Sequence, residues 1–278
     1  MFLTTYSFHL RARNLSPRTI KATEEYLRPF LASCDPLEAS KTDCEAYLAG
    51  LSARCQPSTV WTAWRHLSGF FRRLHAEGDI PVDPMVDIPR PVVPPAEIPM
   101  PTREQVAALL KSCQGKDAVS RRDFALNAVM LDTGLRLTEV INLTVDDVSD
   151  DFTLRVFSKG RKWRTVALGT TSSTALTRWL RARKTDDPRL WTGRKGALTA
   201  SGVRRMLARR STPLGFHLHP HMLRHCFVDT WLCNGGAEVD LARLCGWTST
   251  RMAERYARHR ADERAIAAHK SVAPLDSL

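Results

Sequence analysis

The sequence lacks the features that would place a protein in or across a membrane. No apolar run approaches the roughly 18 residues that a membrane-spanning helix needs. The first residues, MFLTTYSFHLRAR, show neither the basic stretch nor the long apolar core of a secretory signal. The seven cysteines form no C-x-x-C pair and lie mostly in apolar or helical contexts, which is typical of reduced, buried thiols. These absences predict a cytoplasmic protein with no membrane partner.

Tyrosine and clustered metal ligands are also scarce. Of the four tyrosines, only Tyr256 lies beyond position 47, and it stands among arginines in the segment LCGWTSTRMAERYARH. A lone tyrosine on a helix is most often a packing residue, so any chemical role for it depends on other motifs. No carboxylate cluster and no His/Cys set has the spacing of a metal site. We therefore expect chemistry that uses no metal.

Acidic residues are few in the carboxyl-terminal part of the chain. Residues 102–278 hold 30 Lys and Arg against 18 Asp and Glu, an excess of +12, whereas residues 1–80 stand at +2 and residues 81–101 at −2. A basic domain of this size is typical of a protein that binds a polyanion, most often nucleic acid. A basic surface kept for solubility is the alternative that charge alone leaves open.

Proline is concentrated in one segment. Eight of the sixteen prolines fall in residues 81–101, PVDPMVDIPRPVVPPAEIPMP. Because proline fixes φ and has no N–H donor, neither a helix nor a central strand can continue through this stretch. The segment predicts a linker over 81–101, between a first domain at 1–80 and a second at 102–278.

The first domain has the pattern of a small helical bundle. The segment SPRTIKATEEYLRPFLAS starts with Ser16 as an N-cap and Pro17 at the first helical position. With KTDCEAYLAGL and PSTVWTAWRHLSGFFRRLHAEG it indicates four short helices in all. A solvated helix face is as good a reading of each basic residue here as a contact with DNA. The candidates for DNA contacts are Arg18, Lys21, Arg65 and Arg72.

The second domain is also mostly helical by pattern, with one hairpin. Helices are expected over 102–113, 120–134, 136–148, 171–184, 200–211, 220–233, 238–246, 249–259 and 261–269. FTLRVFS and RTVALG alternate as strands do, and KGRK with Gly160 between them predicts the turn of a hairpin. The fold class is therefore mainly α, a helical amino-terminal domain followed by a larger, mostly α domain with a small β-hairpin.

Four separated motifs together point to phosphate chemistry. They are TGLRLTEV with Arg136, FSKGRKWRTVAL with Lys159, HPHMLRH with His221 and Arg224, and LCGWTSTRMAERY with Trp247 and Tyr256. A phosphodiester under attack develops negative charge, which two arginines from different elements can hold with paired N–H donors. A tyrosine hydroxyl, with a free pKa near ~10, needs help to ionise, and a histidine can take its proton. A lysine can protonate the leaving oxygen.

In this order and at these separations, the motifs resemble those of the site-specific tyrosine recombinases, the phage integrase family. The resemblance covers nearly the whole chain, since LSPRTIKATEEYLRPFL is similar to the family's helical core-binding domain. It implies that Arg136 and Arg224 clamp the scissile phosphate. Lys159 is then the general acid, and His221 the base or proton relay. Tyr256 is implied as the nucleophile of a 3′-phosphotyrosyl link, which stores the phosphodiester energy, so no nucleotide cofactor is expected.

Two more positions complete the comparison with the family pattern. Glu139, one turn after the first arginine, is implied to order the site from behind. Most relatives have a histidine where this chain has Trp247. The indole N–H still donates one hydrogen bond, so we expect Trp247 to contact a phosphate oxygen. The chain resembles the compact recombinases that have no arm-binding domain.

The resemblance implies partners as well as chemistry. The expected partner is a double-stranded DNA recombination site, on which the protein would form a homotetramer. An accessory factor that sets the direction of recombination or bends the DNA is a further possible partner. Relatives pass the segment that corresponds to 261–269 to a neighbouring protomer, and folding back within one chain is the alternative. Integration, excision and dimer resolution all stay open.

Two other function classes fit part of the pattern. The first is a DNA-binding protein of this fold that no longer cuts, which is disfavoured because all six catalytic positions are filled. The second is a relaxing topoisomerase with similar chemistry. The separate helical domain before the linker favours recombination over relaxation.

Overall fold

The structure, a computed structural model, describes residues 2–94, 100–158, 162–250, 252–254, 265–266 and 269–270. The chain divides into two compact units, Met1–Ala96 and Glu97–Leu278, each built around a core of its own. Within the described ranges, no helix is both long and apolar enough to cross a membrane.

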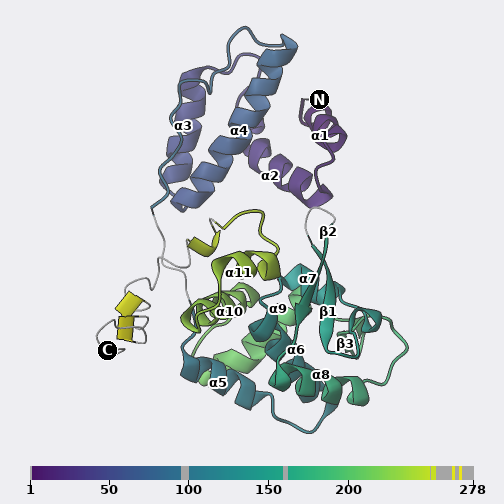
Figure 1. Ribbon diagram of the computed structural model, residues 1–278. Helices are drawn as coiled ribbons and strands as arrows, with labels where there is room; N and C mark the ends of the chain where they lie inside the picture. Colours follow the sequence, from purple (N-terminus) through teal and green to yellow (C-terminus); the bar gives the residue numbers. More distant parts are fainter. Residues whose placement is uncertain are drawn as a thin grey trace. The chain divides into compact units, whose positions relative to one another are not determined.

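The described part of the first unit is a bundle of four helices (Figure 1). These are α1 (Phe2–Ala12), α2 (Pro17–Ser33), α3 (Lys41–Ser52) and α4 (Pro57–Glu77). The side chain of Ser16 accepts a hydrogen bond from the Thr19 N–H, so α2 starts as its sequence predicts. Phe30 and Phe71 are fully buried and meet edge to face, with ring centres 5.7 Å apart.

The proline-rich segment begins on the surface of the first unit. Met85 and Ile88 are buried in that unit's core, and the indole N–H of Trp64 donates to the Ile88 carbonyl at 3.1 Å. The guanidinium of Arg90 lies 4.9 Å from the centre of the Trp61 ring. The stretch predicted as a linker over 81–101 therefore packs on the first unit as far as Arg90, because its methionine and isoleucine offer apolar surface to bury.

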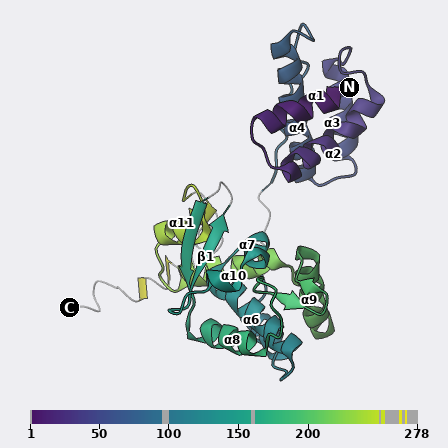
Figure 2. The ribbon, with the colours of Figure 1, turned by 90° about the vertical axis from the view of Figure 1, so that its right-hand side faces the viewer.

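The second unit is built around one buried helix. This is α6 (Ala118–Thr133), against which α8 (Thr170–Ala182) and α10 (Pro220–Cys233) pack. Two further helices, α5 (Arg103–Ser112) and α9 (Ala200–Ser211), contact each other, and α5 also contacts α6. Figure 1 and Figure 2 both show α8 at the lower edge of this unit, below α6. The fold is mainly helical, as the sequence predicts.

A small hairpin stands beside these helices. Strands β1 (Thr153–Ser158) and β2 (Lys162–Ala167) pair antiparallel, with Ser158 opposite Lys162. Its predicted turn, with Lys159 and Gly160, lies outside the described residues. Strands β3 (Thr192–Gly193) and β4 (Gly196–Ala197) form a second, very short antiparallel pair. The sequence pattern does not predict this pair.

The helix predicted over 136–148 is shorter than expected. Helix α7 (Leu137–Asn142) ends early, and the 3-10 turn η1 (Val145–Asp147) follows. The Asp147 carboxylate accepts hydrogen bonds from the N–H and the hydroxyl of Thr144, at 2.9 and 2.8 Å. These local bonds compete with the helical pattern and end the helix, as aspartate and threonine often do.

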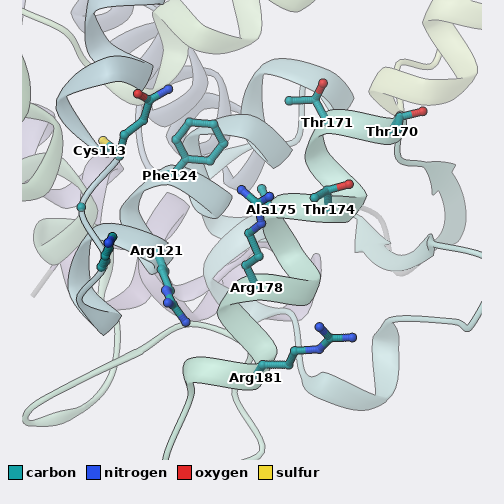
Figure 3. Close-up of a pocket in the computed structure, with 12 residues that line it drawn as sticks. Cys113, Arg121, Phe124, Thr170, Thr171, Thr174, Ala175, Arg178 and Arg181 are labelled. Carbon is teal, nitrogen blue, oxygen red and sulfur yellow. The ribbon is translucent and has the colours of Figure 1, made fainter.

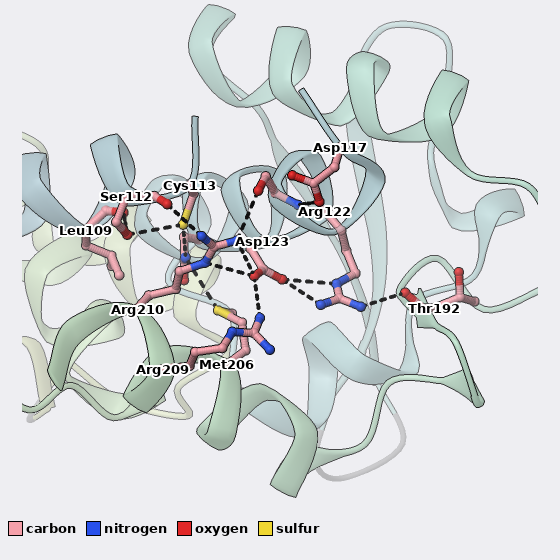
Figure 4. A network of polar contacts seen from close by, with 12 residues as sticks. Leu109, Ser112, Cys113, Asp117, Arg122, Asp123, Thr192, Met206, Arg209 and Arg210 are labelled. Carbon is pink, nitrogen blue, oxygen red and sulfur yellow. Dashed lines mark hydrogen bonds and ion pairs between the residues drawn. The ribbon is translucent and has the colours of Figure 1, made fainter. Parts of the chain in front are cut away.

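A buried carboxylate ties α6 to α9 (Figure 4). Asp123 on α6 is fully buried and accepts hydrogen bonds from Arg122 at 2.7 Å, Arg209 at 2.8 Å and Arg210 at 2.9 Å. Arg210 also donates to the carbonyl of Ser112, at the end of α5. We call these four charged residues the Asp123 cluster. It fixes the ends of three helices with charge-assisted bonds.

Candidate active site

Arg136 lies at the start of α7, directly after a tight backbone turn. Gly134 ends α6 with φ of 59°, a conformation that glycine adopts without strain, and a Cβ there would collide with the Phe227 ring. The Arg136 N–H donates to Glu139 Oε2, and its Nη1 donates to Oε1, both at 2.9 Å. The Arg136 side chain nevertheless stays 32 % exposed, so part of its guanidinium faces open space.

Arg224 on α10 is buried against backbone carbonyls. It is 2 % exposed, donating from Nη1 to the Gly134 carbonyl and from Nη2 to the Cys245 carbonyl at 2.9 Å. Its guanidinium carbon lies 5.4 Å from the centre of the Trp247 ring. Among the described residues, no carboxylate lies within ion-pair distance of it. Arg224 therefore joins the end of α6 to the end of α11 (Glu238–Cys245) without an ion-pair partner among the described residues.

His221 lies one turn before Arg224, and the protein favours its neutral form. Its ring centre lies 4.3 Å from that of His225. Burial lowers the pKa of His221 below the ordinary 6.5, and the positive charges of Arg224, His219 and Arg136 lower it further. The imidazole is therefore neutral near pH 7 and able to accept a proton.

Glu139 is the carboxylate of the site, and it serves two arginines. It is 6 % exposed, and besides Arg136 it accepts from Arg164 on β2, at 3.1 Å to Oε1 and 2.8 Å to Oε2. Burial raises the pKa of Glu139, but the hydrogen bonds from Arg164 and from the Arg136 N–H outweigh it, so the pKa lies below its usual value. Glu139 is ionised and fully occupied in holding the two guanidiniums.

Arg164 also belongs to this site, although the four motifs do not single it out. Its Nε donates to the Leu244 carbonyl at 2.7 Å, and its Nη1 contacts the hydroxyl of Ser158 as well as Glu139. One side chain thus joins the hairpin, α7 and α11. A signal for it exists in RKWRTVAL, since Arg164 alternates onto the same strand face as the buried Val166. A charged residue on a buried face requires partners.

Trp247 is placed by a second left-handed glycine. Gly246 ends α11 with φ of 61°, and a Cβ there would lie 3.1 Å from Arg164 Nη1. The indole is partly buried and lies beside Arg224.

In the part of the chain that the structure describes, no group of three or more His, Cys, Asp or Glu side chains is arranged to hold a metal ion.

The structure brings most of the predicted second-domain residues together. Arg136 contacts Glu139, and Arg224 contacts the Trp247 ring. The charges of both arginines lower the pKa of His221, so all five residues lie in one region. Lys159 and Tyr256 lie outside the described residues. The candidates for DNA contacts belong to the first unit, where Arg18, Lys21, Arg65 and Arg72 are all exposed.

The comparison with known proteins identifies the family. Residues 101–263 match the model of the phage integrase family, and residues 2–77 match that of the phage integrase N-terminal SAM-like domain. The chain is 31% identical over 252 residues to the tyrosine recombinase XerC of Chromobacterium violaceum, covering 86% of this chain and 83% of that protein. It is 28% identical over 260 residues to the tyrosine recombinase XerD of Listeria monocytogenes, with 86% and 87% covered.

The chain therefore belongs to the phage integrase family, the tyrosine recombinases, and its activity is that of a site-specific DNA recombinase. The fold agrees with this. A solved structure of the Tn1549 transposon integrase in complex with transposon right end DNA superposes with a TM-score of 0.78 at 19% identity. That match covers 98% of this chain and 99% of the integrase chain.

Proposed function

We propose that Tyr256 attacks a DNA phosphodiester that Arg136 and Arg224 hold in place. The observation that carries this proposal is the burial of Arg224, whose hydrogen bonds among the described residues go only to carbonyls. A buried guanidinium without a counter-ion is costly, and a phosphate oxygen would supply the missing negative charge. The part-exposed Arg136, which Glu139 holds from one side, offers further N–H donors to the same phosphate.

The reaction that fits these residues is a transesterification. The Tyr256 oxygen bonds to phosphorus as the bond from phosphorus to the 5′-oxygen breaks, which leaves a 3′-phosphotyrosyl link and a free 5′-hydroxyl. The neutral His221 takes or relays the tyrosine proton, and Lys159 gives a proton to the leaving 5′-oxygen. Trp247 donates its indole N–H to a non-bridging oxygen. A 5′-hydroxyl from another strand reverses these steps and reseals the DNA without a nucleotide cofactor.

The partners proposed are a double-stranded recombination site and further copies of the chain. The exposed arginines and lysine of the first unit, at positions 18, 21, 65 and 72, are suited to contact phosphates. Solved structures of the Tn1549 integrase and of a lambda integrase dimer are DNA complexes, which supports a DNA site as the partner. We propose a homotetramer on DNA, in the bacterial cytoplasm or nucleoid, with room for an accessory directionality or DNA-bending factor.

The decisive experiment is to trap the covalent intermediate on a nicked DNA substrate. Wild-type protein should form an adduct that peptide mapping places at Tyr256. Tyr256→Phe should keep its fold and DNA affinity and form no adduct, because only the hydroxyl is removed. Tyr47→Phe is the matched control, since it removes a hydroxyl that bonds the Tyr26 carbonyl at 3.4 Å in the first unit. An adduct that maps to another tyrosine, or that persists in Tyr256→Phe, refutes the assignment.

A further inference from the structure

A hollow of about 750 Å³ lies between α8 and the region that joins α5 to α6. Figure 3 shows Arg121 of α6 and Arg178 of α8 among its lining residues, with the Phe124 ring between the Cys113 segment and the threonines of α8. Its volume is in the range of about 300–1,000 Å³ found for ligand sites. The hollow is therefore large enough to hold one apolar side chain of a bound peptide together with parts of the residues on either side of it.

The rim of this hollow is basic, and no acidic residue lines it. Four of its twelve lining residues are cationic, namely Lys116, Arg121, Arg178 and Arg181, and none of the twelve is acidic. All four are exposed, and none of their side chains forms an ion pair or a hydrogen bond with another described residue. The neighbouring Arg122, by contrast, is committed to the Asp123 cluster. Uncompensated cations on both sides of a hollow favour an anionic occupant.

The hollow is separate from the candidate active site. Neither arginine of that site, nor Glu139, His221 or Trp247, lines it. In Figure 1 and Figure 2 alike, α8 lies at the lower edge of the second unit and α11 at the upper edge. A ligand in the hollow would therefore contact a different face from the DNA strand that is cut.

The floor distinguishes between two kinds of polyanion. Cys113, Phe124 and Ala175 give it an apolar surface beneath the cationic rim, beside the hydroxyls of three threonines. A DNA duplex presents phosphates and sugars outward and keeps its bases stacked, so it would leave this floor unfilled. An acidic peptide with one apolar side chain would fill both parts. We propose that this hollow docks an acidic segment of a partner protein, anchored by a single apolar residue.

The test uses short fluorescein-labelled peptides in fluorescence anisotropy with the full-length chain. One probe has glutamates on both sides of a central leucine, and a second has serine in place of that leucine. The leucine peptide should bind saturably and about fivefold more tightly than the serine peptide, because only its side chain reaches the apolar floor. The double variant Arg121→Glu/Arg178→Glu should weaken binding of the leucine peptide by about tenfold or more.

A charge-matched control separates docking from general attraction. Arg204→Glu/Arg205→Glu makes the same change of charge on α9, where both arginines are exposed and neither lines the hollow. It should change peptide affinity by less than about twofold, the effect expected of remote charges that salt screens. Both double variants should cleave the nicked DNA substrate at the wild-type rate, which tests the hollow independently of the proposed active site.

Any of four binding results would overturn the proposal. The first two are a leucine peptide that does not bind saturably and an equal affinity of the protein for both peptides. The other two are an equal loss of peptide affinity in the two double variants and displacement of the bound leucine peptide by duplex or single-stranded DNA of random sequence. Loss of DNA cleavage in Arg121→Glu/Arg178→Glu, with Arg204→Glu/Arg205→Glu unaffected, would show instead that the hollow belongs to the DNA-binding surface.

Discussion

Two buried carboxylates of the second unit are each met by arginines, and they use those arginines differently. In the Asp123 cluster all three guanidiniums converge on one carboxylate, which leaves an excess of positive charge. Water can solvate part of this charge at Arg209, whose side chain is 57% exposed. Around Glu139, Arg136 and Arg164 are the arginines that converge within the described part of the chain. Arg224 stays apart, buried on carbonyls.

The difference separates a structural ion cluster from a binding site. In the Asp123 cluster each of the three arginines already donates to the carboxylate and so helps to fix the helices, although three guanidiniums and one carboxylate leave a net charge of +2. A buried cation with no carboxylate of its own keeps its attraction for an anion, and the fold must stabilise it by other means. The Asp123 cluster is therefore expected to control stability, and the Glu139 group together with Arg224 is expected to control cleavage.

The largest expected effect is on stability, from Asp123→Asn. This substitution keeps the shape but leaves three arginines around a neutral amide, and breaking a buried ion pair typically costs about 3–5 kcal/mol. We expect a lower urea midpoint, followed by circular dichroism. The exposed Asp150, whose side chain forms no ion pair with a described residue, offers the control Asp150→Asn, with a change within about 0.5 kcal/mol. An equal, small effect of both substitutions would contradict the structural role of Asp123.

The next effect is on the chemical step, from Arg224→Ala. Loss of a preorganised donor to the developing phosphate charge should slow single-turnover cleavage by about 10²–10³-fold. The matched control is Arg209→Ala, which removes the exposed arginine of the Asp123 cluster. It should leave the cleavage rate close to that of the wild type. Similar losses of cleavage in the two variants would erase the distinction between the two arginine groups.

Arg164→Lys tests whether cleavage requires Arg164 to hold the hairpin in position beside the site. Lysine keeps the charge but cannot reproduce the forked contacts to Glu139, Leu244 and Ser158. We expect cleavage to slow by about tenfold, a loss typical of residues that orient functional groups. DNA affinity should not change, because Arg164 is largely buried. Arg155→Lys, on the outward face of β1, is the control, and an equal effect there would count against a positioning role.

The site could be predicted from the sequence where a local pattern fixes the backbone. Gly134 marks the turn before Arg136, and the H-x-x-R spacing puts His221 and Arg224 on one helix face. Arg164 was harder, because its partners come from α7 and α11, far away in the sequence. The Asp123 cluster likewise joins residues about 87 positions apart. The chemical roles of all the site residues, Lys159 and Tyr256 included, stay predictions.

The fold could likewise be predicted where local patterns fix the backbone. The errors in the predicted helix limits have local causes. Helices with clear caps and apolar spacing, such as α2 and α6, begin and end near their predicted limits. The helix predicted over 136–148 stops at Asn142 because the bonds between Thr144 and Asp147 offer the backbone another conformation. Apolar periodicity does not register such competition, since it reports which face is buried and not where the helix ends.

The smallest expected effect comes from His221 and depends on pH. Its pKa is lowered from 6.5 in the folded protein by burial and by the charges of Arg224, His219 and Arg136. The unfolded chain therefore binds the proton more readily, so the contribution of His221 to stability is present above pH 6.5 and is lost as pH falls through the folded pKa. His221→Gln removes this titration and should flatten the dependence of the urea midpoint on pH just below 6.5.

The same substitution links this pH effect to the proposed chemistry. Protonation of His221 would remove the proton acceptor for Tyr256, so wild-type cleavage should decline on the acid side as the imidazole becomes charged. In His221→Gln the rate should be lower throughout, without that decline. His219→Gln is the comparison, because His219 is exposed at the start of α10 and its charge lowers the pKa of His221. This variant keeps the imidazole of His221, so the decline on the acid side should persist and begin at a slightly higher pH. If His221→Gln retained the wild-type pH profile for cleavage, the proton acceptor would have to be another group, and the neutral imidazole would matter only for stability.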